Sequence, residues 1–205
     1  MEKETARIEA FSDGVFAIAI TLLILEIKIP AAGSGELSVQ LLRQWPSYFA
    51  FVFSFAFIGI MWINHHRLFT HIKRSNNALL FLNLLLLLGV TAVPFPTAVL
   101  AQHLGQSDQR AAAMLYHGTY FVIAVFFNIL WRYASRNSLG KDVDAAAANK
   151  ISAQYAVGPL LYLVCIALTW VSVAASLLLN VALAVFFALP PQHAARAANR
   201  MSSTR

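Results

Sequence analysis

Charged residues are scarce in this sequence, and their scarcity argues against an ordinary soluble domain. Aspartate, glutamate, lysine and arginine make up 12% of the 205 residues, about half of the roughly 25% found in soluble domains. Cysteine occurs once, as Cys165, which excludes an intrachain disulfide framework and a cysteine-based metal cluster. The N-terminal residues lack the basic stretch and small-residue cleavage site of a secretory signal. We therefore expect the first apolar segment to remain in the protein.

Long apolar runs take the place of the missing charges. Hydrophobic residues make up 59% of the chain, and no Asp, Glu, Lys or Arg occurs in residues 44–66, 75–107, 111–131 or 151–195. Each run can cross a bilayer, which takes about 20 apolar residues, and the last is long enough for two crossings. With the first apolar segment, the sequence predicts an all-α, polytopic membrane protein with six transmembrane helices per subunit. The predicted helices are residues 8–29, 46–64, 78–100, 112–131, 151–169 and 174–189, with the last turn near 169–176.

The basic residues predict how the chain is oriented. All but three of the 15 lysine and arginine residues lie in the N-terminal arm, the loops after the second and fourth helices, and the C-terminal tail. The exceptions are Lys28, Arg43 and Arg110. By the positive-inside rule, both termini are cytoplasmic. The net charge of +6 is then explained by topology and by attraction to anionic lipid, so no nucleic-acid partner is expected.

Glycine and proline mark the breaks along the chain. Residues 33–35 predict a flexible outer loop, and the Pro94/Pro96 and Gly158/Pro159 pairs should kink or end regular helix. Pro190 and Pro191 should terminate the sixth helix. We divide the chain into a membrane unit, residues 1–190, and a small, polar tail, residues 191–205, that is predicted to be disordered and cytoplasmic.

The first predicted helix has two unlike faces. At 3.6 residues per turn, its apolar residues form one narrow stripe of Phe11, Ile18, Leu22, Leu25 and Ile29. Its polar residues Glu9, Ser12 and Asp13 point away from that stripe. Ionisable groups at membrane depth usually face a bundle interior or water. The stripe itself suits either a packing or lipid-facing surface, or a hydrophobic pore constriction in a closed symmetric oligomer.

The start of this helix also carries a recognisable motif. Residues 7–13, Arg-Ile-Glu-Ala-Phe-Ser-Asp, resemble the Arg-x-x-x-Phe-Ser-Asp signature of the transmembrane protein 175 family of potassium channels. The similarity extends to residues 14–30, to Trp-Ile-Asn-His-His at 62–66, to Asn83 and to Pro94-Phe95. The resemblance implies a single-repeat, bacterial channel subunit that assembles as a homotetramer in the plasma or inner membrane, with the first helix lining the pore and K⁺ as the permeant ion.

The resemblance also implies roles for individual residues. Apolar rings of Ile18, Leu22 and Leu25 form the constriction in place of a carbonyl filter, and the sequence has no Thr-Val-Gly-Tyr-Gly run. Thr21 corresponds to a threonine of cation selectivity. The signature residues are Arg7, Phe11, Ser12 and Asp13, for which His65, His66 and Asn83 offer supporting polar contacts. No cofactor and no metal are implied.

Two other functions compete with a channel. Five histidines, at positions 65, 66, 71, 103 and 117, could ligate a haem or metal of a membrane enzyme. Their predicted locations at opposite ends of the bundle argue against this, and we expect no enzyme. The alternative is a small secondary transporter with a substrate site at the Pro-kinked third and fifth helices, although no inverted repeat is found.

Overall fold

The computed structural model describes residues 5–31, 35–139 and 145–189, which form helices joined by short connections. The helices are α1 (Ala6–Leu22), the 3₁₀ helix η1 (Leu23–Glu26), α2 (Leu37–Arg43), α3 (Trp45–His71), α4 (Asn77–Ala92), α5 (Pro94–His103), α6 (Gln109–Asn137), α7 (Ala145–Leu168) and α8 (Val173–Ala188). Within the described residues, the only β pairing is an isolated bridge between Ile72 and Leu139. The predicted all-α class is confirmed for this part of the chain.

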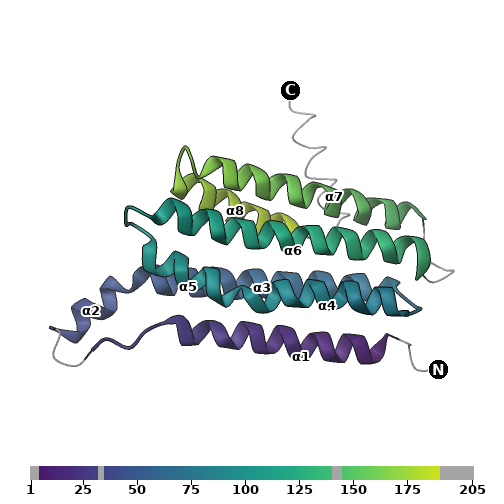
Figure 1. The fold of residues 1–205 in the computed structure, drawn as a ribbon, viewed down its shortest axis with the longest axis horizontal. Coiled ribbons are helices and arrows are strands. Elements are labelled where there is room, and N and C mark those ends of the chain that lie inside the picture. The colour runs from purple at the N-terminus through teal and green to yellow at the C-terminus, as the bar shows by residue number, and fades with distance from the viewer. Residues whose placement is uncertain (1–4, 32–34, 140–144, 190–205) are drawn as a thin grey trace.

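The long helices run side by side along one axis (Figure 1). The α1 helix lies at one side of the bundle, where it contacts α3 and α4, while α7 and α8 lie at the opposite side beyond α6. Consequently α1 has one face against the bundle and another face that no other part of the described subunit covers.

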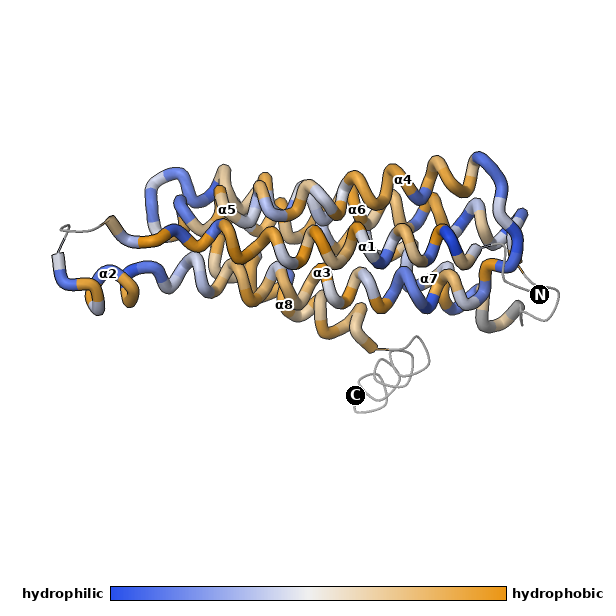
Figure 2. Tube along the Cα trace, turned by 90° about the horizontal axis from the view of Figure 1, so that it is seen from below, coloured by the Kyte–Doolittle hydropathy of each residue, from blue (hydrophilic) through white to orange (hydrophobic). Residues whose placement is uncertain are grey.

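The bundle has the length and hydropathy of a membrane protein. Five segments are long and apolar enough to cross a membrane: Ala6–Glu26, Trp45–His71, Asn77–His103, Gln109–Asn137 and Ala148–Leu168. Hydrophilic residues gather at the two ends of the bundle, coloured blue in Figure 2. The sixth predicted span is present as α8, an apolar helix of 16 residues, somewhat shorter than the about 20 residues of a full crossing. The six-span topology therefore stays a prediction.

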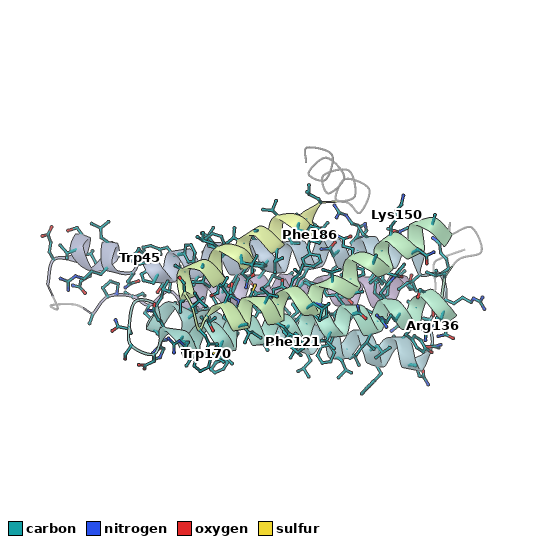
Figure 3. The ribbon with its side chains drawn as sticks, turned by 90° about the horizontal axis from the view of Figure 1, so that it is seen from above. Trp45, Phe121, Arg136, Lys150, Trp170 and Phe186 are labelled. Carbon is teal, nitrogen blue, oxygen red and sulfur yellow. The ribbon has the colours of Figure 1, made fainter. Side chains whose placement is uncertain are left out.

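The two ends of the bundle differ in their side chains. Arg136 and Lys150 lie at the end where α1 begins, whereas Trp45 and Trp170 lie at the other end (Figure 3). The connection between α3 and α4, with Lys73, is at the same end as Arg136 (Figure 1). We call this the basic end. Its location in the cytoplasm, and that of both termini, stays a prediction from the positive-inside rule.

The first helix is shorter than predicted. Regular α-helix stops at Leu22, tightens to a 3₁₀ turn over Leu23–Glu26, and gives way to extended backbone at Ile27. Two local effects explain the early end. Ile27 and Ile29 are β-branched and favour extended backbone, and Pro30 disfavours helical backbone at Ile29. The predicted helical stripe therefore holds as far as Leu22, with Leu25 in the 3₁₀ turn and Ile29 outside the helix.

The two proline sites behave differently. At Pro94 the third predicted span divides, since α4 ends at Ala92 and α5 begins at Pro94, where a missing N–H is tolerated. At Pro159 the helix continues, because α7 runs unbroken from Ala145 to Leu168. Tight packing accompanies this continuity: a Cβ on Gly158 would lie 3.6 Å from the Cβ of Ala124 on α6. The helix end predicted for the third span is thus confirmed, whereas Pro159 does not end α7 and a kink there stays a prediction.

The connections contain one helix that the sequence did not predict. Residues 33 and 34 of the predicted outer loop lie outside the described residues, but Gly35 has a φ of 125°, which glycine adopts readily. The short α2 follows and extends from the end of the bundle opposite the basic end (Figure 1). The turn between α7 and α8 lies within the predicted region, and α8 ends at Ala188, just before Pro190. The predicted tail, residues 191–205, lies outside the described residues.

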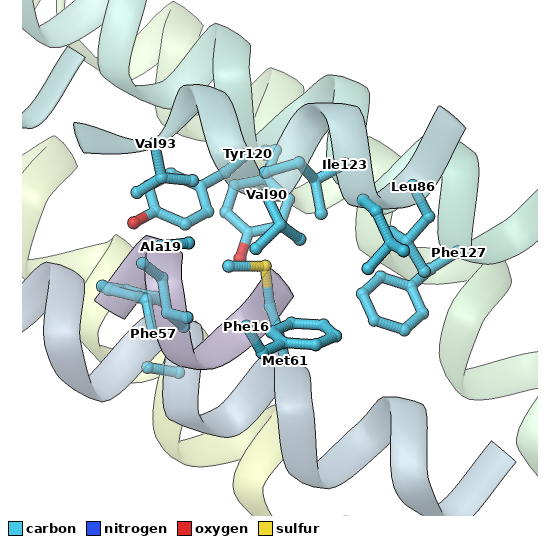
Figure 4. Close-up of a cluster of buried hydrophobic side chains, with 14 of the residues drawn as sticks. Phe16, Ala19, Phe57, Met61, Leu86, Val90, Val93, Tyr120, Ile123 and Phe127 are labelled. Carbon is cyan, nitrogen blue, oxygen red and sulfur yellow. The ribbon is translucent and has the colours of Figure 1, made fainter. Parts of the chain in front are cut away.

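Core side chains pack the buried face of α1 against the rest of the bundle. Figure 4 shows Phe16 and Ala19 of α1 beside Phe57 and Met61 of α3, with Val90 of α4 close by. Phe16 and Ala19 are almost completely buried. Burial of such side chains holds the axis and rotation of α1 against α3 and α4, and so determines which of its side chains face outward.

Candidate pore-lining face and its anchoring network

The outward face of α1 is apolar. Three residues of the predicted stripe are substantially exposed in the subunit, Ile18 at 59%, Leu22 at 42% and Leu25 at 64%. The buried residues of the same helix are Ile8, Ser12, Phe16 and Ala19. Large apolar side chains exposed along a membrane helix must face either lipid or another subunit. This outward face is therefore available for assembly around a shared axis.

Ser12 holds the opposite face of α1 in a buried hydrogen-bond network. The Ser12 hydroxyl donates to the Ile8 carbonyl at 2.7 Å and accepts from the Asn83 amide at 3.0 Å. The Asn83 carbonyl oxygen in turn lies 2.9 Å from His65 Nε2, and we infer that Nε2 donates because the amide oxygen can only accept. One connected network thus ties α1 to α4 and α3.

Aromatic packing reinforces this network. The His65 ring lies between Phe16 on α1, at 5.4 Å between ring centroids, and Phe69 on α3, at 4.4 Å. Ser12, His65 and Asn83 are all buried. Polar groups that are buried and hydrogen-bonded specify one arrangement, because any shift of the helices would leave them without partners. The structure therefore brings together Ser12, His65 and Asn83 among the predicted site residues.

Asp13 has a different partner from Ser12. Its carboxylate is exposed in the subunit and accepts a hydrogen bond from Trp62 Nε1 at 2.8 Å. Trp62 also stacks on His66, with 6.3 Å between the ring centroids. His66 therefore reaches the signature residues through Trp62 and does not take part in the Ser12 network. In the sequence, Trp62 is recognisable only as part of the family resemblance, because the 49-residue separation from Asp13 conceals their contact.

The other two signature residues face outward. Phe11 is 57% exposed and Arg7 is also exposed. Two ion pairs are found among the described residues, and Arg7 belongs to neither of them. These two side chains thus contribute little to the packing within one subunit.

Thr21 lies beside the apolar stripe with its hydroxyl group turned toward the backbone. Thr21 is exposed, and its Oγ1 donates to the Ile18 carbonyl at 2.9 Å. A hydroxyl has one proton but can also accept through its lone pairs. Because the proton is used within the helix, the oxygen presents acceptor capacity to its surroundings, which is the property that a cation ligand requires.

The end of the apolar stripe carries a charge pair. The Glu26 carboxylate lies 3.6 Å from Lys28 Nζ, and the same amine donates to the Leu25 carbonyl at 3.3 Å. Both residues lie at the end of the subunit opposite the basic end, where solvent screening keeps such a pair weak. Glu26 is thus partly neutralised by its neighbour.

The described part of the chain contains no cluster of side chains typical of a metal site. No group of three His, Cys, Asp or Glu residues is placed to hold a metal ion there. His117 instead lies in a second buried network, in which Asn180 Nδ2 donates to its Nδ1 at 2.7 Å. Its Nε2 lies 3.0 Å from Ser176 Oγ. Both ring nitrogens of His117 therefore already have hydrogen-bond partners.

Known proteins resemble this chain along most of its length. The family described as "Endosomal/lysosomal potassium channel TMEM175" matches residues 7–94. A potassium channel of Chamaesiphon minutus is 49% identical over 92% of this chain and 95% of its own length. A potassium channel of Streptomyces collinus is 47% identical over 90% of this chain and 91% of its own. A crystal structure described as a lysosomal potassium-selective channel TMEM175 homolog from Chamaesiphon minutus covers 92% of this chain and 98% of its own, with a TM-score of 0.85.

Proposed function

This chain belongs to the TMEM175 family, and from that premise we propose that it forms a potassium-selective ion channel. The observation that carries the proposal is the division of α1 into two faces. One face is fixed to the bundle through Ser12 and Phe16, while the other presents Ile18, Leu22 and Leu25 outside the subunit. An exposed apolar stripe on a rigidly held membrane helix suits a pore wall.

The proposed pore is formed by four subunits. One α1 helix cannot enclose a path by itself, so the stripe lines a conduit only in a closed ring of identical subunits. We assign a homotetramer with α1 of each subunit at the central axis. We place the basic end in the cytoplasm, in the plasma or inner membrane of a bacterium, as suits relatives from Chamaesiphon and Streptomyces.

The apolar rings form the constriction in this proposal. Ile18 and Leu25 are about 12 Å apart along the axis, at about 1.5 Å per residue to Leu22 and about 2.0 Å per residue in the 3₁₀ turn beyond it. Rings of branched apolar side chains at this spacing exclude bulk water when they are close together, and a narrow dry segment admits an ion only if it sheds part of its hydration shell. That requirement favours K⁺, whose hydration shell is held less tightly than that of Na⁺.

Thr21 supplies partial compensation for the lost water. Its Oγ1 donates to Ile18 O, so its lone pairs remain for a passing cation. Four such oxygens around the axis form a ring of weak ligands next to the Ile18 and Leu22 rings. We therefore assign Thr21 to cation selectivity.

Arg7 and Phe11 face outward on the same helix, and we assign them to contacts between subunits.

A secondary transporter has less support. That alternative depended on broken helices at both proline sites, since half-helix ends form the substrate sites of such proteins. The break at Pro94 is present, but α7 passes Pro159 without interruption. One of the two expected elements is therefore missing.

Potassium flux in proteoliposomes tests the proposal. We expect single-channel currents down a K⁺ gradient from the purified protein. Ile18→Asn should wet the constriction, raise the cation flux and weaken the preference for K⁺ over Na⁺. Ile63→Asn on α3 is a matched control, since Ile63 is also exposed but does not lie on α1. Identical currents and selectivity in the wild type and Ile18→Asn would contradict the assignment of Ile18.

A further inference from the structure

A narrow cavity lies between α3, α6, α7 and α8, and no residue of α1 lines it. About 510 Å³ of its space is not filled by atoms when the open side is counted, but water-sized spheres can be centred in only about 50 Å³ of it. Its wall is almost entirely apolar or aromatic and includes Phe57, Met61, Tyr120, Phe127, Tyr162 and Phe187. Because Phe187 and other wall residues are only half-buried, the cavity reaches the surface of the subunit. The cavity is thus a narrow, partly open apolar slot, along which a slender apolar ligand can lie.

Polar side chains of α3 stand at the end of this cavity nearest the basic end. The Asn64 amide donates to the Phe187 carbonyl at 3.0 Å, and Arg67 Nη1 donates to the Ala188 carbonyl at 3.2 Å. The α8 helix stops at Ala188, while α3 continues to His71 and α7 also extends further toward the basic end. The Arg67 guanidinium therefore lies at the end of α8, close to the cavity.

Among the described residues, no carboxylate forms an ion pair with Arg67. Neither ion pair among the described residues includes it, and the side chain is half-buried. A guanidinium has several N–H donors in a planar fork, of which the bond to Ala188 uses one. Partly buried cations in apolar surroundings are unfavourable without an anionic partner, and the fork matches the oxygens of a phosphate group.

The depth of Arg67 in the membrane suits a lipid headgroup. Arg67 lies about 14 Å from the middle of α3 at 1.5 Å per residue. Half of a hydrocarbon core of about 30 Å is a similar distance. The guanidinium is thus at the level where the phosphates of one leaflet begin, with the apolar cavity extending from there toward the bilayer centre. A second cation, Lys150, lies on α7 at the same basic end.

We propose that this cavity and Arg67 form a binding site for an anionic phospholipid of the cytoplasmic leaflet. One acyl chain occupies the cavity beside Phe127 and Tyr162, and the phosphate accepts hydrogen bonds from Arg67. The leaflet rests on the membrane orientation given under Proposed function, whereas the binding itself does not depend on ion conduction. Such a lipid stabilises the ends of α8 and α3 on the side of the subunit remote from α1.

Native mass spectrometry of the intact protein tests the site. The purified protein is stripped of lipid in detergent and titrated with phosphatidylglycerol, with phosphatidylcholine of the same acyl chains, and with inorganic phosphate. We expect saturable retention of one phosphatidylglycerol per subunit, with about tenfold weaker retention of phosphatidylcholine, because the choline cation offsets the charge of its phosphate beside Arg67. Inorganic phosphate should not displace the lipid.

Variants separate the two parts of the site. Arg67→Gln should weaken phosphatidylglycerol retention by about tenfold, and Arg67→Lys should restore most of it. Ala184→Leu, which fills the cavity from α8, should weaken retention of both lipids. Arg136→Gln removes a cation from the basic end but away from the cavity and should leave retention unchanged.

Several outcomes would overturn the site. Equal retention of both lipids by the wild type removes the role of the headgroup charge. Displacement of the lipid by inorganic phosphate identifies a phosphate site without an acyl chain. Equal losses of phosphatidylglycerol retention in Arg67→Gln and Arg136→Gln would mean that the lipid is held by general attraction to a basic surface. These wild-type and variant readouts require no current, so a failure of potassium conduction leaves the lipid result intact.

Discussion

Two buried hydrogen-bond networks in this subunit use the same three residue types in different places. The first consists of Ser12, Asn83 and His65, and the second of Ser176, His117 and Asn180. In the first, asparagine bridges serine and histidine, whereas in the second histidine is the bridge. The first fixes α1 to α4 and α3, and the second fixes α8 to α6. Similar chemistry therefore serves a helix with an outward apolar face and a helix far from it.

The location of each network in the subunit determines whether it affects stability alone or also the orientation of α1. Each network stabilises the bundle by pairing polar groups that are costly to bury alone. Only the first controls the rotation of α1, and through it the direction of Ile18 and Leu22. The second leaves Asn180 Oδ1 without a partner among the described residues, so it is also the less completely satisfied of the two. We expect both to matter for stability and only the first for ion flux.

Breaking the first network at its centre should have the largest effect. Asn83→Leu leaves the His65 donor without a partner and removes a bond to Ser12, at a cost of about 1–3 kcal/mol for each orphaned group. We expect a lower melting temperature and a loss of most K⁺ flux per assembled channel, because α1 is no longer held. Melting in detergent and flux normalised to oligomer content measure the two effects. Wild-type flux from assembled Asn83→Leu would contradict the role of this network.

Breaking the second network at its centre separates stability from conduction. His117→Leu deprives the Asn180 amide and the Ser176 hydroxyl of their shared partner, again at about 1–3 kcal/mol per orphaned group. The melting temperature should fall by an amount comparable to that of Asn83→Leu. Flux per assembled channel and selectivity should equal those of the wild type. A shift in selectivity in His117→Leu would show that α8 is coupled to the pore.

The smallest effect is expected at Asp13. Asp13→Asn removes the charge but leaves a carbonyl oxygen that can accept from Trp62 Nε1, so the change in stability should stay below about 1 kcal/mol. Melting temperature and flux should both remain close to wild type. A loss as large as that of Asn83→Leu would mean that the assembled protein supplies a cation to this carboxylate. Asp13→Ala, which also removes the hydrogen bond, is the more disruptive comparison.

The sequence predicted which residues of α1 face outward better than it predicted where the helices end. Periodicity identified the outward residues of α1, because a helix that packs on one side repeats its apolar residues every three to four positions. The same periodicity predicted too long a helix, since a constant angle per residue does not register the change to 3₁₀ at Leu23 or the influence of Pro30 on Ile29. The short α2 was missed because seven residues are too few to display a period.

Pairing between distant residues was the other limit. The family resemblance pointed to His65 and Asn83 as polar partners, and the structure joins Asn83 to Ser12 and His65 to Asn83. The Trp62 contact of Asp13 could not be derived, because an indole on an apolar helix is equally suited to lipid or to core. Pro159 was another such case, since the packing around Gly158 that accompanies an unbroken α7 involves α6 and α8, which are remote in sequence.

The 3₁₀ turn that carries Leu25 gives the proposed constriction unequal mechanical properties along its length. Ile18 and Leu22 belong to regular α-helix with good hydrogen bonds, while Leu25 is held by the tighter and poorer bonds of a 3₁₀ turn. The stiffness of α1 therefore drops between the second and third rings. Under a force that widens the path, such as membrane tension or a change in bilayer thickness, the Leu25 ring yields first and the Ile18 ring last.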